Sequence, residues 1–121
     1  IYAGSDIFLM PSKFEPCGLG QLISLRYGTI PVVRSTGGLV DTIKDYTLDP
    51  KKGNGFSFTE FSKDKFYDAL MRAIKLYKQS PAKWQELVGR ALKLDFSWNA
   101  SAEKYMDLYK KAIKKGKRKG I

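Results

Sequence analysis

Two short glycine-containing segments hold the residues best suited to chemistry. The first, residues 11–20, reads Pro-Ser-Lys-Phe-Glu-Pro-Cys-Gly-Leu-Gly and leads into a predicted helix over 18–27. The first amides of a helix lack intrahelical acceptors and lie at the positive end of its dipole, so this junction favours an anion. Gly18 and Gly20 would let a phosphate or sugar approach the backbone, and Glu15 could accept hydrogen bonds from hydroxyls. Spacing alone favours equally the alternative that the glycines serve only the turn and Glu15 is solvated.

The second segment, residues 34–39, repeats the pattern with Arg-Ser-Thr-Gly-Gly-Leu between an apolar run and another helix. If the two runs are neighbouring strands, the two segments frame one crevice. Arg34 would meet an anion there or, equally often for an arginine at a strand end, serve as a structural ion-pair partner.

The elements that must position these segments alternate along the chain. Short apolar runs predict strands at 7–10, 30–33 and 56–58, with the first strand buried on both faces. Periodicity predicts helices at 18–27 and 39–44, a loop at 46–54, and three further helices starting near Ser62, Ser80-Pro81 and Ser97. This order predicts an α/β fold, a Rossmann-like parallel sheet with crossover helices, in which ligands bind beyond the carboxyl ends of the strands.

The helices are expected to bury their apolar stripes in the core. In the helix over 18–27 the predicted buried side comprises Leu19, Leu22, Ile23 and the stem of Arg26. The three later stripes are Phe66, Leu70, Ala73, Ile74 and Tyr77; Trp84, Leu87, Val88, Ala91 and Leu92; and Ala102, Tyr105, Met106, Tyr109 and Ile113. Core packing is favoured over a ligand role for these aromatic and methionine residues.

Composition excludes several classes of protein. The 121 residues suit one domain, and 43% hydrophobic with 28% charged residues is typical of a globular chain. The absence of histidine excludes Ser-His-Asp and Cys-His catalysis and histidine metal sites within this chain. A single cysteine, Cys17, permits no internal disulfide and favours an intracellular protein. The chain begins with Ile1, has no signal-peptide pattern and no run long enough to span a membrane, and is interpreted as a piece of a longer cytoplasmic protein.

The formal charge of +10 is unevenly distributed. Seven of the 22 basic residues lie in 110–121, which leaves 15 basic against 12 acidic residues, a net of +3, in the rest of the chain. We interpret 110–121 as a solvated helix end and tail, with a polyanion-binding arm as the less favoured alternative. The basic residues lack the pattern of an RNA-recognition sheet or a zinc finger, so a nucleic-acid partner is not expected.

Longer stretches of sequence closely resemble bacterial glycogen synthases and plant starch synthases. The motif Glu-Pro-Cys-Gly-Leu at 15–19 is an uncommon one and is part of this resemblance. The stretches that carry the likeness are 6–22, 25–34, 36–42, 53–58 and 96–98, so it covers nearly the whole chain except the lysine-rich end.

The resemblance implies a retaining glycosyltransferase of the GT-B fold, with two Rossmann-like domains facing a cleft. Such enzymes transfer glucose from ADP-glucose, or UDP-glucose in some members, to the non-reducing end of an α-1,4-glucan. Residues 1–109 would then be most of the C-terminal, donor-binding domain including its terminal helices, and 110–121 a basic helix end and tail. The missing N-terminal domain would supply the acceptor site and a histidine, so this chain would be inactive alone. The expected location is cytoplasmic, or plastid in a plant.

The family's roles carry over to matching positions. Glu15, the catalytic candidate, would bind the donor sugar's hydroxyls; the backbone at Cys17, Gly18 and Leu19 would contact the glucose, and Gly20 the diphosphate. Cys17 is interpreted as a pocket-lining residue rather than a nucleophile. Further cleft-lining candidates are Ser12, Lys13, Arg34, Thr36, Gly37 and Gly38. The implied mechanism is a front-face displacement in which the leaving phosphate helps to deprotonate the acceptor, with no cofactor and no metal.

Two positions depart from the common pattern of related GT-B enzymes. Gly20 stands where most relatives have a hydroxyl residue. Ile23 stands where many carry a second glutamate, which the glycogen synthase branch commonly lacks. The alternatives are another GT-B hexosyltransferase, such as a sucrose-type synthase, and a basic RNA-binding module. Because the final helix can pack against the first domain in the family, Tyr105 and Tyr109 are expected to be partly exposed here.

Overall fold

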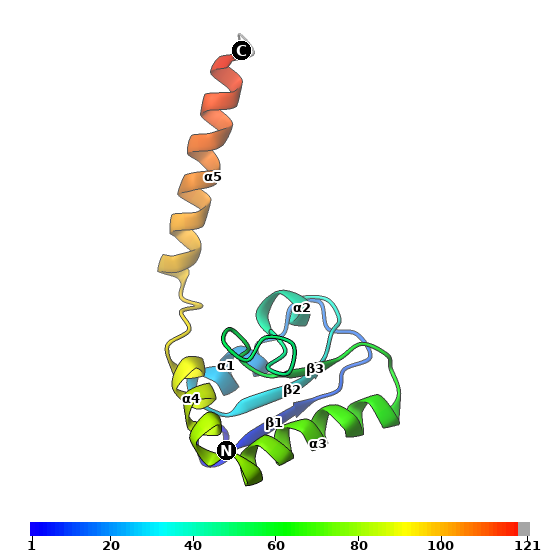
Figure 1. Cartoon of the computed structure of the whole chain (residues 1–121). Helices are drawn as coiled ribbons and strands as arrows, with labels where there is room; N and C mark the ends of the chain where they lie inside the picture. The colour runs from blue at the N-terminus through cyan, green and yellow to red at the C-terminus, as the bar shows by residue number, and fades with distance from the viewer. Residues whose placement is uncertain (119–121) are drawn as a thin grey trace.

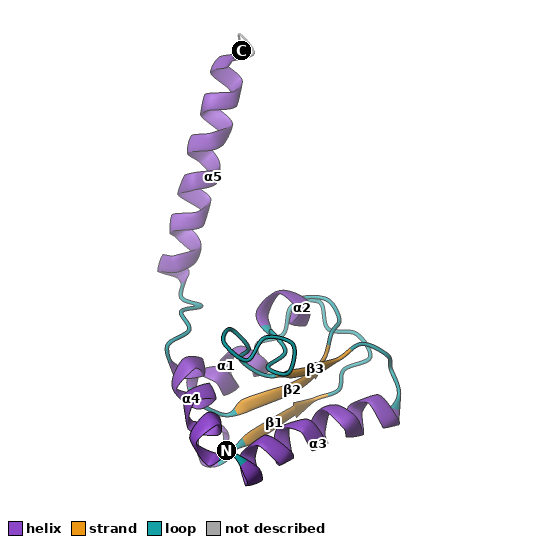
Figure 2. Ribbon diagram, in the orientation of Figure 1, coloured by secondary structure: helices purple, strands orange, loops and turns teal. Residues whose placement is uncertain are grey.

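The computed structural model describes residues 1–118 (Figure 1). After a short 3-10 helix that was not predicted, three strands and five α-helices follow one another in the predicted order within these residues (Figure 2). They are η1 (Tyr2–Gly4), β1 (Ile7–Met10), α1 (Gly20–Arg26), β2 (Ile30–Arg34), α2 (Leu39–Thr42), β3 (Phe56–Phe58), α3 (Lys63–Gln79), α4 (Pro81–Leu92) and α5 (Trp98–Arg118). The predicted helix starts at Ser62 and Pro81 are confirmed: Ser62 Oγ accepts from the Lys65 amide at 3.3 Å, and Pro81 occupies the first turn of α4.

The sheet is parallel, in the order β1-β2-β3, which confirms the predicted fold class. Ile7 pairs with Ile30 and Val32 with Phe56. The middle strand β2 is apolar because both of its faces are covered, and residues 30–33 are all buried. Because β1 and β2 run parallel, the loops that follow them leave the sheet at the same edge.

The prediction that β1 is buried on both faces is wrong. Within the described residues β1 pairs only with β2, and Leu9 is 45% exposed while its neighbours are half-buried. An apolar run of four residues indicates a strand, but it does not tell an edge strand from a central one.

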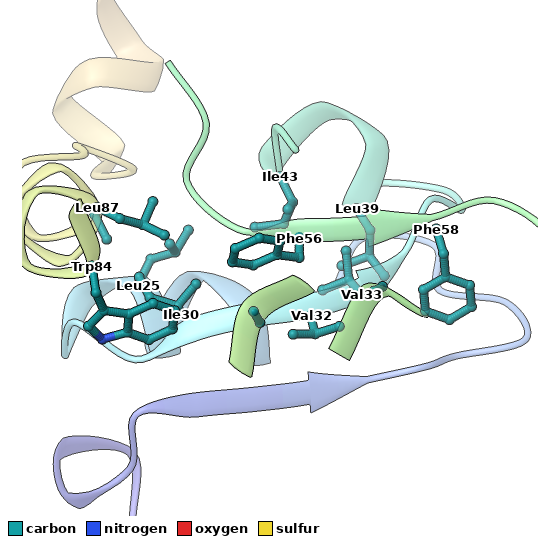
Figure 3. Packing of buried hydrophobic residues seen from close by; sticks show 13 residues of the cluster. Leu25, Ile30, Val32, Val33, Leu39, Ile43, Phe56, Phe58, Trp84 and Leu87 are labelled. Carbon is teal, nitrogen blue, oxygen red and sulfur yellow. The ribbon is translucent and has the colours of Figure 1, made fainter. Parts of the chain in front are cut away.

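The core lies between the sheet and helices α1 to α4 (Figure 3). Phe56 of β3 lies beside Ile43, the residue that follows α2, and Trp84 and Leu87 of α4 pack beside Leu25 of α1. Tyr77 and Trp84 meet edge to face with ring centroids 5.2 Å apart, which joins α3 to α4. Burial of these side chains is the main source of stability for the sheet edge that carries both loops.

The face of α1 that is buried differs from the predicted one. Gln21, Ser24 and Leu25 are buried, whereas Leu19 is 68% and Ile23 40% exposed. These exposed residues line an open groove of about 600 Å³ whose other wall is the segment 94–97. Gln21 faces inward because the preceding loop, described below, supplies hydrogen-bond acceptors there, whereas the Ser24 hydroxyl donates within the helix, to Gln21 O.

An ion pair between a buried aspartate and a half-buried arginine joins α3 to the loop before β3. Arg72 Nη1 lies 2.9 Å from Asp45, whose side chain is only 4% exposed, and Arg72 Nη2 donates to Ser57 O at 2.7 Å. Burial raises the pKa of Asp45, but hydrogen bonds from Ser57 and Arg72, the Arg72 charge and the Thr47 amide outweigh it and hold that pKa below its ordinary value. Asp45 therefore stabilises the folded state when its carboxyl group is ionised.

Helix α5 stands away from the rest of the structure (Figure 1). Tyr105, Met106, Tyr109 and Ile113 are all between 55% and 60% exposed, so the prediction that this stripe packs in the core is wrong. The expectation of exposed Tyr105 and Tyr109 is confirmed. The predicted tail at 110–121 is helical as far as Arg118, and its last three residues lie outside the described part. None of the helices in the described part is both long and apolar enough to cross a membrane.

Candidate functional site

The two glycine-containing loops lie against each other at the carboxyl ends of β1 and β2, as predicted. The Gly38 amide donates to Pro16 O at 3.1 Å. A Cβ on Gly37 would lie 1.9 Å from Glu15 O, and one on Gly38 would lie 2.6 Å from Cys17 O. Gly37 also has a φ of +49°, which disfavours other residues. Both glycines therefore let the second loop touch the backbone of the first.

Glu15 sits half-buried on the first loop. Ser12 Oγ lies 3.4 Å from Glu15 Oε2, a weak hydrogen bond. Within residues 1–118 no salt bridge involves Glu15. Its carboxylate thus keeps most of its acceptor positions for hydroxyl donors from outside the chain.

Arg34 holds the first loop through main-chain carbonyls. Its Nε lies 3.0 Å from Ser12 O, Nη2 lies 2.5 Å from Lys13 O, and Nη1 lies 2.9 Å from Thr59 O. The guanidinium also lies 5.6 Å from the centre of the Phe61 ring. Of the two predicted roles the structure favours the structural one, although its partners are carbonyls rather than a carboxylate.

The backbone of 17–20 presents donors without protein acceptors. Within the described residues, the amides of Cys17, Gly18, Leu19 and Gly20 donate to no main-chain or side-chain acceptor. Cys17 is an exposed free thiol, and Gly18 has a φ of +78°, which gives the turn its left-handed conformation. Four successive free N–H groups can receive negatively charged or hydroxylic oxygens.

Gly20 has a packing role that spacing did not predict. A Cβ there would lie 3.0 Å from Phe8 Cζ and 3.6 Å from the Tyr2 hydroxyl. The rings of Tyr2 and Phe8 themselves pack with centroids 5.3 Å apart. A side chain at position 20 would therefore require the Phe8 ring to shift slightly.

The remaining predicted site residues lie on the same two loops. Ser12 and Thr36 are half-buried, and the Lys13 side chain is exposed. Residues 1–118 contain no cluster of three or more potential metal ligands. One residue with a clear role in the loop, Gln21, was not singled out from the sequence; the only available signal was a polar residue three and four positions after Gly18 and Cys17, within hydrogen-bonding reach of a helix start.

The chain is similar to known proteins over most of its length. The family model described as "Glycosyl transferases group 1" matches residues 1–88. The chain is 57% identical to a glycogen synthase from Desulforudis audaxviator over 115 residues, covering 95% of this chain and 23% of that protein. It is 55% identical to a glycogen synthase from Moorella thermoacetica over 115 residues, covering 95% of this chain and 24% of that one.

A solved structure is similar over the same range. The catalytic domain of starch synthase IV from Arabidopsis thaliana, bound to ADP and acarbose, superposes with a TM-score of 0.83 at 46% identity, covering 94% of this chain and 24% of that one. The chain thus spans about a quarter of the length of each of these relatives.

Proposed function

The chain belongs to the glycosyl transferases group 1 family, and on that premise we propose that it is the donor-binding part of a glycogen or starch synthase. The observation that carries the proposal is the 57% identity to a glycogen synthase over 95% of the chain. The whole enzyme would transfer glucose from ADP-glucose or UDP-glucose to an α-1,4-glucan, and the site would take the nucleotide sugar. The similar starch synthase structure, with its bound ADP and acarbose, supports these two ligand classes.

In this proposal residues 1–109 form most of the C-terminal domain of a two-domain enzyme, and 110–121 form its basic helix end. Glu15 accepts hydrogen bonds from the donor sugar's hydroxyls. The free amides of Cys17, Gly18, Leu19 and Gly20 receive the sugar and the diphosphate. Fixed N–H groups stabilise the charge that develops on the leaving diphosphate without reorganising during the reaction. Ser12, Lys13, Arg34, Thr36, Gly37 and Gly38 shape the wall of the cleft.

Substitution of Glu15 in the full-length enzyme tests the proposal. Glu15→Ala removes a charged acceptor and is expected to lower kcat/KM for the donor about a hundredfold, and Glu15→Gln about tenfold, because hydrogen bonds to charged groups are worth about 1.5–3 kcal/mol. Glu60→Ala is the matched control, since Glu60 is an exposed glutamate after β3. Steady-state kinetics with an unchanged circular dichroism spectrum supply the measurement. Near-normal turnover by Glu15→Ala would contradict the role of Glu15.

The donor itself is identified by titrating the 121-residue chain with ADP-glucose, UDP-glucose and a short RNA. Amide NMR shifts centred on residues 17–20 with one sugar nucleotide would support the site and rank the two donors. Shifts restricted to the basic end of α5 with RNA would favour the polyanion-binding alternative instead.

A further inference from the structure

Gln21 has an amide side chain that is buried directly beneath the first loop, residues 11–20. It is fully buried at the start of α1. Its Nε2 lies 3.0 Å from Gly18 O, 3.2 Å from Cys17 O and 3.3 Å from Thr42 Oγ1. Because the two nearest partners are carbonyl oxygens, the nitrogen of the amide must face them. Gln21 therefore ties two successive loop carbonyls to one side chain.

These bonds complete a row of inward-facing carbonyls. Pro16 O accepts from the Gly38 amide at 3.1 Å, and Leu19 O accepts from the Ile23 amide at 2.9 Å as the first bond of the helical turn. Gln21 holds the two carbonyls between them. All four carbonyls at 16–19 are thus engaged by the protein.

The planar trans peptide turns this arrangement into a row of donors. In each peptide unit the C=O and the following N–H point in opposite directions. Fixing the carbonyls of Cys17 and Gly18 toward Gln21 thereby directs the amides of Gly18 and Leu19 away from it. These are two of the free amides described above.

The space for Gln21 depends on Gly18. A Cβ on Gly18 would lie 2.5 Å from Gln21 Oε1, so a side chain at position 18 would displace the amide. Gln21 Oε1 itself has no hydrogen-bond partner among the described residues, and a buried polar atom without a partner is costly. The hydrogen bonds that Nε2 donates offset the cost of leaving the side-chain oxygen without a partner.

We propose that Gln21 is the positioning residue of the donor site, which orients the Gly18 and Leu19 amides toward an oxygen of the nucleotide sugar. This inference rests on the proposed function. Gln21 does not touch the ligand; it acts through the loop, and Thr42 Oγ1 links it to α2.

The test replaces Gln21 with methionine, which has similar volume but no N–H. The matched control is Ser24→Ala: Ser24 is equally buried one turn later, and its Oγ bonds to Gln21 O at 2.8 Å rather than to the loop. The first measurement is the ¹H–¹⁵N heteronuclear NOE of residues 17–19 in the free 121-residue chain. We expect it to fall in Gln21→Met and to stay unchanged in Ser24→Ala. An unchanged NOE in Gln21→Met would overturn the proposal.

The second measurement titrates the full-length enzyme and its two variants with ADP. The Kd is expected to rise about tenfold in Gln21→Met and less than twofold in Ser24→Ala, because only Gln21→Met removes the hydrogen bonds that orient the Gly18 and Leu19 amides. Equal weakening in both variants would overturn the proposal by assigning the effect to helix stability. A loosened loop in Gln21→Met, together with no ADP binding by the unmodified enzyme, would overturn the proposed function and leave the loop-fixing role of Gln21 intact.

Discussion

Helices α4 and α5 both carry an apolar stripe, but their surroundings are opposite. Both carry an aromatic residue within an apolar stripe at helical spacing, yet Trp84 of α4 is buried and Tyr109 of α5 is 58% exposed. Helix α4 follows α3 after a single residue, Ser80, and folds back onto α1 and the sheet. Helix α5 follows a longer connection and points away from them (Figure 1). Periodicity therefore predicts an apolar face but not what covers it.

The largest expected difference between the two helices is in the cost of removing an aromatic ring. Trp84→Ala leaves a cavity between α4, α3 and α1, and is expected to lower the free energy of unfolding by about 3–5 kcal/mol. Tyr109→Ala removes an exposed ring and is expected to change it by less than about 0.5 kcal/mol. Urea unfolding of the 121-residue chain, followed by circular dichroism, measures both. A cost for Tyr109→Ala close to that of Trp84→Ala would show that α5 packs in solution against the rest of the structure, called the body below.

Two ion pairs within residues 1–118 show the same difference in exposure. Asp45 pairs with Arg72 in the body at 2.9 Å, whereas Asp107 pairs with Lys110 on α5 at 3.8 Å with both side chains about 70% exposed. Asp45→Asn is expected to cost about 2 kcal/mol, since it leaves Arg72 without its partner, while Asp107→Asn costs less than about 0.5 kcal/mol. The same unfolding assay compares the two variants, and equal costs would contradict the difference in burial.

The pH dependence follows from the lowered pKa of Asp45. A carboxyl with a lower pKa in the folded state than in the unfolded state contributes stability above the unfolded pKa, about 3.9, and loses it as pH falls toward the folded pKa. Unfolding midpoints between pH 6 and 2.5 should fall less steeply below pH 4 in Asp45→Asn than in the unmodified chain. Parallel curves would argue against this linkage.

The smallest expected effects come from two glycines with open space around them. A Cβ on Gly89 in α4 or on Gly116 in α5 would meet no atom within 4 Å. In the interior of a helix, alanine is more favourable than glycine by about 1 kcal/mol. Gly89→Ala is therefore expected to raise the unfolding free energy of the body by about 0.5–1 kcal/mol. Gly116→Ala should increase helical signal without moving the unfolding midpoint, and a shift equal to that of Gly89→Ala would mean that α5 unfolds together with the body.

Much of the fold could be predicted because local chemistry determines it. The three apolar runs, the Ser62 cap and Pro81 act within a few residues, and each lies where expected. The adjacency of the two loops followed from the parallel order of the strands. The glycogen synthase resemblance pointed to the same loops, and the roles of their individual residues stay predictions.

The wrong predictions, on the buried face of α1 and on the burial of β1, share a different cause. Leu19 and Ile23 were expected inside and Gln21 was overlooked, because hydropathy ranks a glutamine as a surface residue. Its burial depends on carbonyls that the loop turns toward it, and the direction of a carbonyl leaves no mark in the sequence. The exposure of Leu9 likewise depends on which strands pair, which a four-residue run does not encode.

The contact between Gly37 and the Glu15 carbonyl has a consequence for how this surface can change. With only 1.9 Å between a Cβ built at position 37 and that oxygen, residue 37 cannot be larger than glycine while the first loop keeps its path. The two segments therefore change together, although more than twenty positions separate them in the chain. Divergence of the one requires a matching displacement of the other, and transplanting this surface into another scaffold requires both together.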